Sequence, residues 1–417
     1  MRRLHVPVFG LFKQYAGLPR SIYILFFARI VNRMGDFVHF FLTLFLTRIM
    51  GMDESTTGIF VMAVSLSRIV GSMIAGKIGD HRGRKTAMLL FLFLFAVTLV
   101  FCGIFVYSMA TPILLILAGL FNGAERPLNN TIVTDITTRE ERKRAFSLLY
   151  LGINIGVAVG PMLAGLLFNN FIRWIFFGDA LTSLLAIVLI YKYVPESKPD
   201  EATLKTSMET AEHEERAETG STFRVFLKRP VLAASTLFMV LSSFVYAQHA
   251  FSLPIQLDHL FGEDSARLYG FIMSFNAGIV LAATSLLLYI SRHIMPLRNI
   301  SFANLLYALG FGMMAFIQEF PMFLVSAVFW TIGEILVVTN YNVFVANHTP
   351  ISHRGRFNGL LQIIIGMGFA FSPLLSGIFV DTIGLSVLWK GVGILSIILG
   401  LCFYILSEWD KRRNKII

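Results

Sequence analysis

The chain has 417 residues, of which 56% are hydrophobic and only 14% are charged. A soluble domain carries about 25% charged residues, so this chain lacks the polar side chains that cover a water-soluble fold. The formal net charge of +10 lies in short clusters between apolar segments, which argues against nucleic-acid binding. The composition therefore predicts an integral membrane protein.

Twelve apolar segments follow one another along the chain, and a bilayer core takes about 20 apolar residues of helix. The segments lie near residues 21–49, 57–76, 87–106, 111–135, 145–168, 174–193, 231–257, 267–290, 299–317, 321–347, 357–380 and 384–407. Most connections between them are too short to be domains. We predict an all-α membrane protein with twelve transmembrane helices.

One long polar stretch, residues 194–222, is rich in Glu and nearly free of large apolar side chains. Such a segment cannot bury a core, and residues 223–229 after it have the pattern of a short amphipathic helix at the membrane surface. We predict an N-terminal six-helix half (1–193), a cytoplasmic linker with the amphipathic segment (194–230) and a C-terminal six-helix half (231–417).

The Lys and Arg residues alternate between the two sides of the predicted membrane. With the N-terminus inside, the cytoplasmic segments hold clusters such as 82–85, 139–144 and 411–415, and the outside turns hold only Arg48, Arg173, Arg267 and Lys390. Positive residues concentrate on the cytoplasmic side of membrane proteins. We expect a multi-pass protein of the cell inner (plasma) membrane with both termini in the cytoplasm.

An ungapped repeat relates spans five and eleven. Residues 144–165 read RAFSLLYLGINIGVAVGPMLAG, and residues 356–377 read RFNGLLQIIIGMGFAFSPLLSG. At a constant offset the matching pairs are Arg144 and Arg356, Leu148 and Leu360, Gly156 and Gly368, Pro161 and Pro373, and Gly165 and Gly377. Two parallel six-helix repeats are a known transporter architecture, so the repeat supports two equivalent halves.

The turn between spans two and three, residues 76–85, reads GKIGDHRGRK and is called the signature loop below. Its glycines permit a tight turn between two helices. Asp80 can accept hydrogen bonds from a helix N-terminus or pair with an arginine. The residues that define the loop are Gly76, Asp80, Gly83, Arg84 and Lys85. The alternative is a positively charged cytoplasmic turn in which Asp80 is incidental.

This loop resembles the signature of the major facilitator superfamily, with His81 where Arg or Lys is usual. The resemblance extends over the whole chain, through the spans, the central linker and the repeated halves. It implies the major facilitator fold and alternating access around a midplane site. It also implies that the loop is a cytoplasmic latch, which holds that side closed and breaks when the side opens.

Span five carries small residues at three-to-five spacing, which allow close helix approach, and a proline that kinks the helix. They are Gly152, Gly156, Gly160, Pro161 and Gly165. The pattern resembles the fifth helix of proton-coupled exporters in the superfamily. Glycine-rich helices also occur in uptake proteins, so ordinary packing remains the alternative.

Six ionisable residues lie near the predicted midplanes, where charge is costly and commonly functional. They are Arg33, Asp36, Arg68, Glu125, Arg126 and Glu334. Arg33 and Asp36 are three apart on one helical face, and that stripe continues to Arg29 and His39. With three acids and three bases, the set can balance inside the bundle, and fixed ion pairs are the structural alternative to function.

Proton coupling requires a carboxyl group that loads and releases a proton. Glu334 is the leading candidate, because its own helix has no neighbouring base and because it resembles an acidic position in the tenth helix of some drug:proton antiporters. Asp36 or Glu125 is the second candidate. Arg33 on the same face as Asp36 favours a permanent ion pair there.

Further polar and aromatic residues are candidates to line a substrate cavity, although half or more of such residues form interhelical hydrogen bonds. The candidates, which include three arginines, are Arg33, Arg68, Arg126, Asn122, Asn154, Tyr246, His249, Tyr341 and Gln362. The sequence has no phosphate-binding Gly-Lys-Ser/Thr loop, zinc-type Cys/His cluster or nucleophile elbow. We expect no enzyme activity, cofactor or metal.

The resemblance is strongest to bacterial multidrug efflux antiporters, and it implies proton-coupled export of amphipathic small molecules. Export or flipping of a lipid or glycolipid is one alternative. Uptake of a small anionic or zwitterionic solute is another, because Arg33, Arg68 and Arg126 could clamp a carboxylate. A membrane receptor or scaffold would need neither midplane charges nor a latch. We expect a monomer whose partners are its substrate, protons and the lipid bilayer.

Overall fold

The structure, a computed structural model, describes residues 15–197, 226, 229–348 and 354–413. Over these residues the chain is helical and contains no strand. Its contacts divide it into two compact units. Unit 1 comprises residues 1–39 and 64–200, and unit 2 comprises residues 40–63 and 201–417. Residues 198–222 of the predicted linker and most of its amphipathic segment lie outside the described residues.

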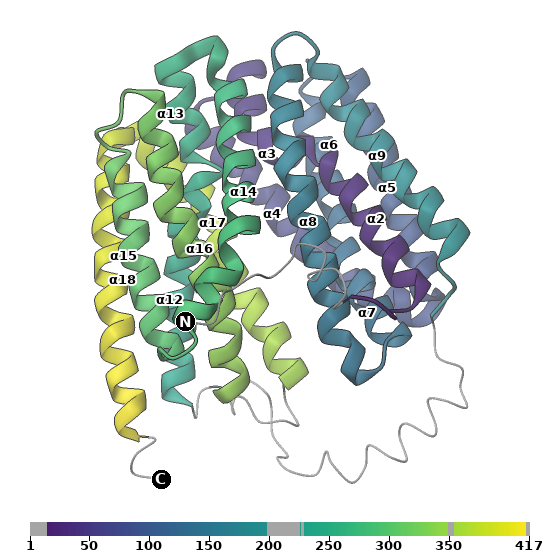
Figure 1. The fold of residues 1–417 in the computed structure, drawn as a ribbon. Coiled ribbons are helices and arrows are strands. Elements are labelled where there is room, and N and C mark those ends of the chain that lie inside the picture. Colours follow the sequence, from purple (N-terminus) through teal and green to yellow (C-terminus); the bar gives the residue numbers. More distant parts are fainter. Residues whose placement is uncertain (1–14, 198–225, 227–228, 349–353, 414–417) are drawn as a thin grey trace. The chain divides into compact units, whose positions relative to one another are not determined.

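The helices of unit 1 are drawn in purple to blue in Figure 1. They are α2 (Arg20–Met34), the start of α3 (Phe37–Leu44), most of α4 (Glu54–Arg82), α5 (Arg84–Ile104), α6 (Ala110–Gly123), α7 (Glu125–Ile136), α8 (Arg139–Phe168) and α9 (Ile172–Tyr193). Helix α2 packs against both α8 and α9, and α5 packs against α6 and α9.

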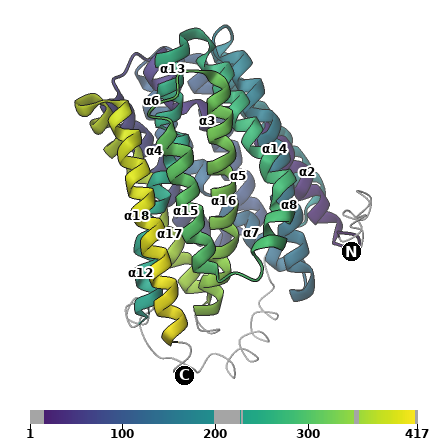
Figure 2. The same cartoon turned by 60° about the vertical axis from the view of Figure 1, so that its left-hand side comes forward.

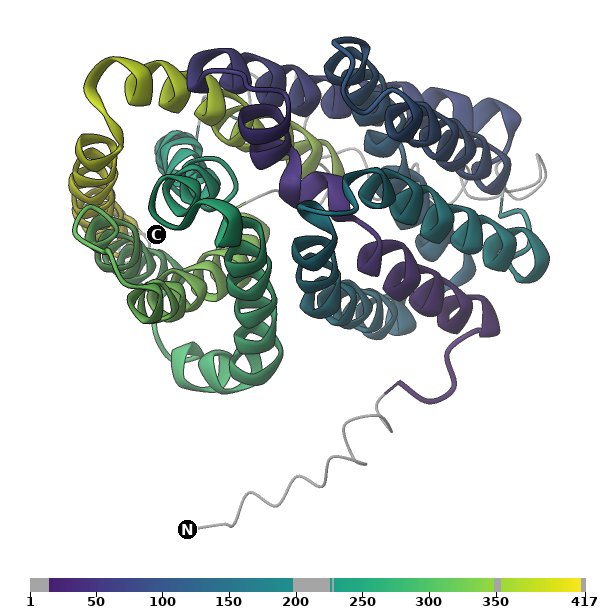
Figure 3. The same cartoon turned by 90° about the horizontal axis from the view of Figure 1, so that it is seen from above.

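Unit 2 contains the π-helical turn η1 (Phe45–Ile49), the first residues of α4 and the remaining helices. These are α12 (Pro230–Tyr246), η2 (Ala247–His249), α13 (Ser252–Phe261), η3 (Gly262–Asp264), α14 (Ser265–Ser291), α15 (Pro296–Met313), α16 (Phe320–His348), α17 (Arg354–Ile383) and α18 (Leu385–Arg413). Helix α15 packs between α16 and α18, as Figure 2 shows. From above, the yellow α18 stands beside the green helices (Figure 3).

Helices lie over every predicted span, and the all-α membrane fold class is confirmed. Among the described residues, eight stretches are long and apolar enough to cross a membrane. One of these stretches, Pro230–Ser291, contains both the seventh and the eighth predicted spans. The number of twelve crossings stays a prediction.

Three predicted spans are interrupted rather than continuous. The first breaks at Gly35 and Asp36 between α2 and α3, the fourth at Ala124 between α6 and α7, and the seventh between residues 247 and 251. Irregular backbone at membrane depth is tolerated only where protein or water satisfies it. Asp36, Glu125 and the η2 turn therefore lie where backbone N–H and C=O groups need partners outside the regular helical hydrogen bonds.

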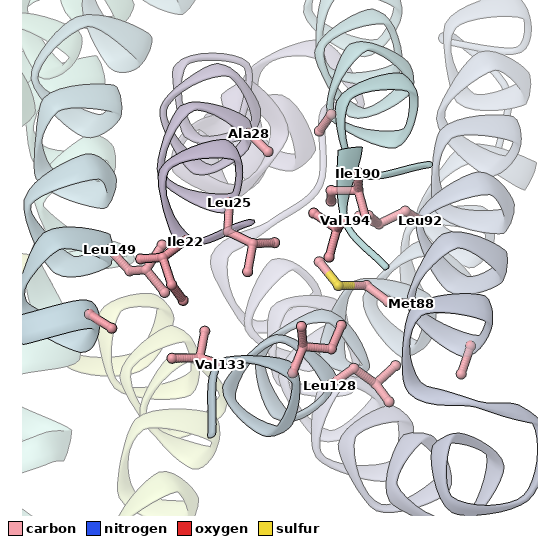
Figure 4. Packing of buried hydrophobic residues seen from close by; sticks show 14 of the residues in the cluster. Ile22, Leu25, Ala28, Met88, Leu92, Leu128, Val133, Leu149, Ile190 and Val194 are labelled. Carbon is pink, nitrogen blue, oxygen red and sulfur yellow. The ribbon is translucent and has the colours of Figure 1, made fainter. Parts of the chain in front are cut away.

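A continuous apolar core fills one end of unit 1. Figure 4 shows Leu25 of α2 facing Met88 of α5, with Leu128 of α7 and Ile190 of α9 closing the same space. Each of these side chains is at most 2% exposed. Helices α4 and α8 contribute to the same core, which holds in place the polar residues that α2, α7 and α9 carry.

Aromatic side chains form the corresponding core of unit 2. Phe311 on α15 stacks between Trp330 of α16 and Trp389 of α18, with ring centroids 6.0 and 6.1 Å away. All three side chains are fully buried. Stacked aromatic rings contribute about 0.5–1.5 kcal/mol per pair beyond burial of their area, so this stack fixes the packing of α15 against its two neighbours.

The matched glycines of the repeat, Gly156 and Gly368, allow close contact between two helices in each unit. A Cβ on Gly156 of α8 would lie 2.5 Å from the Cβ of Arg33 on α2. A Cβ on Gly368 of α17 would lie 2.0 Å from the backbone oxygen of Val240 on α12. Spans five and one therefore pack in unit 1 as spans eleven and seven pack in unit 2, with backbones in direct contact.

The segment 40–63 contacts residues of unit 2 that are more than 200 positions away in the sequence. The Thr43 hydroxyl donates to the Ala250 carbonyl (3.0 Å), and Arg48 pairs with Asp258 (3.4 Å). The backbone N–H of Ser55 donates to Asp381 of α17 at 2.8 Å. These contacts explain why the segment belongs to unit 2 although it precedes the predicted linker.

Candidate functional site

A chain of buried ion pairs crosses unit 1 at the break in the first span. Arg29 lies 2.9 Å from Glu125, and Arg33 bridges Glu125 (3.3 Å) and Asp36 (2.5 Å). Arg29 and Glu125 are only 5% and 4% exposed. The stripe predicted on α2 thus faces the first residue of α7, and the expected pair between Arg33 and Asp36 is present.

Arg68 of α4 has a different environment. Its guanidinium contacts Nδ1 of His39 (3.0 Å) and donates to the side-chain oxygen of Asn122 (3.1 Å). No carboxylate of the described residues lies within ion-pair distance of it. Arg126, next to the buried Glu125, is exposed. Of the three arginines expected to clamp an anion, Arg33 is bound to two carboxylates, whereas Arg68 and Arg126 are not.

The prediction overlooked Asp179, a buried carboxyl group in the middle of α9. It is 1% exposed, and it accepts one long hydrogen bond, from the backbone N–H of Val38 at 3.4 Å. One turn further on, Ser183 accepts a hydrogen bond from Asn32 of α2 at 3.3 Å. The sequence signal was a lone acid within the apolar run FFGDALTSLL, which meets the same criterion as the six chosen residues.

A small cavity opens beside the ion pairs, no larger than a water molecule. Arg29, Asn32, Glu125 and Asn129 supply its polar lining, and Asn129 Oδ1 has no hydrogen-bond partner among the described residues. A buried water typically joins about three polar groups. This cavity can hold one solvent molecule against the ion pairs and is too small for a substrate.

In unit 2, Glu334 lies half-buried on α16. It accepts a hydrogen bond from the Asn276 side chain of α14 at 2.9 Å and one from Tyr246. Asn276 also donates to Thr331, at 2.9 Å. Among the described residues, no cation lies within ion-pair distance of Glu334. The three predicted acids therefore separate: Asp36 and Glu125 are ion-paired in unit 1, and Glu334 is held by neutral donors in unit 2.

Aromatic rings lie around Tyr246, which donates a hydrogen bond to Glu334. The ring of Tyr246 lies 4.3 Å from that of His249 and 6.3 Å from that of Trp330, and His249 stacks on Trp330 at 5.7 Å. His249 Nδ1 is 2.6 Å from the Tyr246 carbonyl. Phe369 of α17 completes the group, 6.4 Å from His249. Together these rings form one wall beside Glu334.

The other cavity candidates are dispersed. Asn154 donates to the Tyr150 carbonyl of its own helix at 2.8 Å, and the hydroxyl of Tyr341 lies 3.3 Å from that of Thr236. Both side chains are buried, whereas Gln362 is exposed. Asn154 and Tyr341 thus have structural hydrogen bonds and do not join either polar cluster.

The signature loop is held by acids that lie outside it. Gly83 adopts a φ of +98°, which favours glycine, and α5 begins at the next residue. Glu196 accepts the backbone N–H groups of Arg84 (2.8 Å), Lys85 (3.0 Å) and Thr86 (3.1 Å). The carboxylate therefore caps the positive end of α5.

The other residues of the loop differ in their partners. The Arg84 side chain pairs with Asp135, and Lys85 donates to the Tyr191 carbonyl at 2.8 Å. Gly76 is exposed. Asp80 is also exposed and has no hydrogen bond or ion pair within the described part of the chain. Neither Asp135 nor Glu196 was expected to hold the loop, since Glu196 begins the polar linker by composition.

The Glu196 carboxylate titrates outside the membrane spans. Burial raises the pKa of this group, but the hydrogen bonds from the backbone of Lys85, Thr86 and Ser197 outweigh burial, so its pKa is lowered from its ordinary value. The cap is therefore charged throughout the neutral range.

Two bacterial relatives match about four fifths of the chain. The Bacillus subtilis multidrug resistance protein 1 is 25% identical over 79% of this chain and 82% of its own length. An uncharacterised B. subtilis transporter, YqjV, is 25% identical over 82% of both chains. A POT family transporter in complex with 5-aminolevulinic acid superposes with a TM-score of 0.75 at 15% identity, covering 94% of this chain and 96% of the other.

That structural likeness concerns the fold alone. The family model for the Major Facilitator Superfamily matches residues 25–350 and 296–416. With the helical fold, the repeated halves and the signature loop, it shows that this chain is a multi-pass membrane transporter of the Major Facilitator Superfamily.

Proposed function

We propose that the protein exports amphipathic small molecules in exchange for protons, by alternating access. The observation that carries this proposal is Glu334, a half-buried carboxyl group with two neutral donors and no ion pair among the described residues. Such a group can gain or lose a proton without stranding a buried cation. The likeness to multidrug resistance protein 1 supports the same class of substrate.

The rings beside Glu334 suit an amphipathic substrate. Tyr246, His249 and Phe369 offer flat apolar faces, and a carboxylate next to them supplies one polar anchor. Ligand sites of transporters and receptors commonly combine an aromatic lining with a few polar groups. Glu334 is the proposed principal proton carrier, and Asp36 or Glu125 was the second candidate on the sequence. The ion pairs of these two acids favour a structural role for both.

Reconstitution in proteoliposomes tests the proposal. An imposed pH gradient should drive uphill movement of ethidium, used as a cationic amphipathic probe. Glu334→Gln should abolish that movement and keep downhill exchange, because exchange needs no proton cycle. Glu319→Gln is the matched control, since Glu319 is exposed and precedes the same helix. Gradient-driven transport by Glu334→Gln at the wild-type rate would remove Glu334 from the mechanism.

Uptake of a small anion is the second candidate function. Arg68 and Arg126 support it, because neither has a carboxylate partner among the described residues. The 4-hydroxybenzoate transporter PcaK of Pseudomonas aeruginosa is 28% identical over 36% of this chain and 34% of its own length. Accumulation of labelled 4-hydroxybenzoate by vesicles, lost in Arg126→Gln, is the expected sign. No accumulation above empty vesicles would exclude this substrate.

The signature loop is the proposed cytoplasmic latch, in a protein of the inner membrane with both termini inside. Asp80 is exposed and is not held within unit 1, so it is available to a partner that forms and breaks during the cycle. Asp80→Asn should slow ethidium transport and leave expression near normal. Unchanged transport would show that the loop is only a topological anchor.

A further inference from the structure

Asp179 differs from the other buried charges of unit 1. Its side chain is 1% exposed, and its one hydrogen bond, from the Val38 backbone, is long at 3.4 Å. Among the described residues, no Lys, Arg or His lies within ion-pair distance. Every other buried carboxylate of this unit has at least one arginine at 3.3 Å or less.

Helices α2, α5 and α8 pack against α9, the helix of Asp179. Helix α2 carries Arg29 and Arg33, and α5 carries Cys102, while Asp36 lies at the break after α2 and Arg68 lies on α4. Electrostatic interaction links Asp179 with Asp36, Arg33 and Arg68. These are the charges that a proton on Asp179 would affect most strongly.

Of Arg29, Arg33 and Arg68, only Arg68 has no carboxylate partner among the described residues. Arg29 and Arg33 bind Glu125 and Asp36. Arg68 binds only the neutral oxygen of Asn122 and a ring nitrogen of His39. Among the described residues, unit 1 thus holds a buried acid, Asp179, without a cation at ion-pair distance, and within the same unit Arg68 has no carboxylate at that distance. An isolated ionised carboxylate is very costly to bury, and the neutral acid is not.

We propose that Asp179 is a proton-binding site of the N-terminal unit and that Arg68 is its ion-pair partner once the proton has left. In the conformation described, Asp179 is the neutral acid. On release, its O–H bond breaks, the proton passes to water on the open side, and the negative charge is neutralised by Arg68. The significance for transport rests on the proposed proton coupling, with Asp179 replacing Asp36 or Glu125 as the second carrier.

The position of Asp179 links the proton to the backbone. Its carboxyl group accepts a hydrogen bond from the backbone N–H of Val38. Val38 is the second residue of α3 and follows the break at Gly35 by three residues. Negative charge is favourable at a helix N-terminus. Loss of the proton would strengthen that hydrogen bond and draw Arg68 from Asn122. The two changes would alter the contacts on both sides of the break.

Infrared spectroscopy of the purified full-length protein tests the site without a substrate. Wild type at neutral pH should show the C=O stretch of a protonated carboxyl group, and Asp179→Asn should lose that contribution. Asp36→Asn is the matched control and should retain it, because Asp36 is ion-paired. An unchanged protonated-carboxyl signal in Asp179→Asn would overturn the proposal.

Thermal melting separates proton binding from a merely structural role. Asparagine mimics the neutral acid, so Asp179→Asn should melt within about 2 °C of wild type, whereas Asp36→Asn should melt several degrees lower because it leaves Arg33 with one partner fewer. A large loss for Asp179→Asn would show that the ionised form is the native one. Absence of ethidium transport in wild type would count against the proposed function and leave the infrared result intact.

Discussion

Replacing Glu125 by Gln removes the centre of the buried ion-pair chain. Glu125 receives both Arg29 (2.9 Å) and Arg33 (3.3 Å), and it is 4% exposed. The variant keeps the volume and one acceptor oxygen but leaves Arg29 without a counter-charge. Breaking a buried pair by removing one partner costs about 3–5 kcal/mol. We take the lower end, about 3 kcal/mol, because the amide still accepts one hydrogen bond.

That loss corresponds to a fall in melting temperature of about 6–12 °C, since 1 kcal/mol shifts a unit of this size by about 2–4 °C. The chain supplies its own probe. Cys102 is fully buried, so it should react with a thiol-specific fluorophore only when unit 1 unfolds. The assay needs a Cys402→Ser background, because Cys402 is partly exposed.

Glu334→Gln in the same background is the matched control for Glu125→Gln. Both variants make the same chemical change at a carboxyl group in a membrane helix. Glu334 has neutral donors, so its replacement strands no buried charge and should leave the melting temperature nearly unchanged. Equal melting temperatures for the two variants would refute the claim that the ion pairs hold unit 1 together.

Three further predictions concern packing, the α5 cap and topology. Gly368→Ala should destabilise by about 1–3 kcal/mol through overpacking, whereas Gly366→Ala should be neutral in the same melting assay, because its Cβ would meet nothing within 4 Å. Glu196→Gln should lower the melting temperature at neutral pH. Because the folded pKa is lowered from 4.5, the wild-type advantage is full above that value and disappears as the pH falls through the folded pKa. A membrane-impermeant thiol reagent outside the cell should label a cysteine placed at 262 and miss one at 210; the opposite labelling would invert the topology.

The spans were predictable because a run of about 20 apolar residues has few other interpretations. The breaks were not predicted, because the polar residues around Gly35 and Ala124 were interpreted as functional groups within continuous spans. Their irregular backbone is stabilised by contacts such as the hydrogen bond from Val38 to Asp179. Such contacts join residues far apart in the chain and leave no local pattern.

Most residues of the candidate site were predicted from the sequence, but most of the partners that they contact were not. The stripe with Arg33 and Asp36 followed from helical spacing, and the pair is present. Asp179 was not predicted, because the six candidates already balanced in charge without it. In the structure the six residues do not form one balanced set of charges. Glu334 belongs to unit 2, and Arg29 joins the ion pairs of unit 1.

The segment 40–63 has a consequence for how the protein is made. It leaves the ribosome early, yet Arg48 contacts Asp258, and the Ser55 N–H contacts Asp381, residues 210 and 326 positions later. These contacts close some of the longest loops in the chain, so they form late. During synthesis Arg48 and the Ser55 N–H therefore lack these partners until residues 258 and 381 have been made. A delay at this stage gives membrane chaperones and proteases a defined target, and substitutions at Arg48 should reduce the yield of protein more than the stability of the finished molecule.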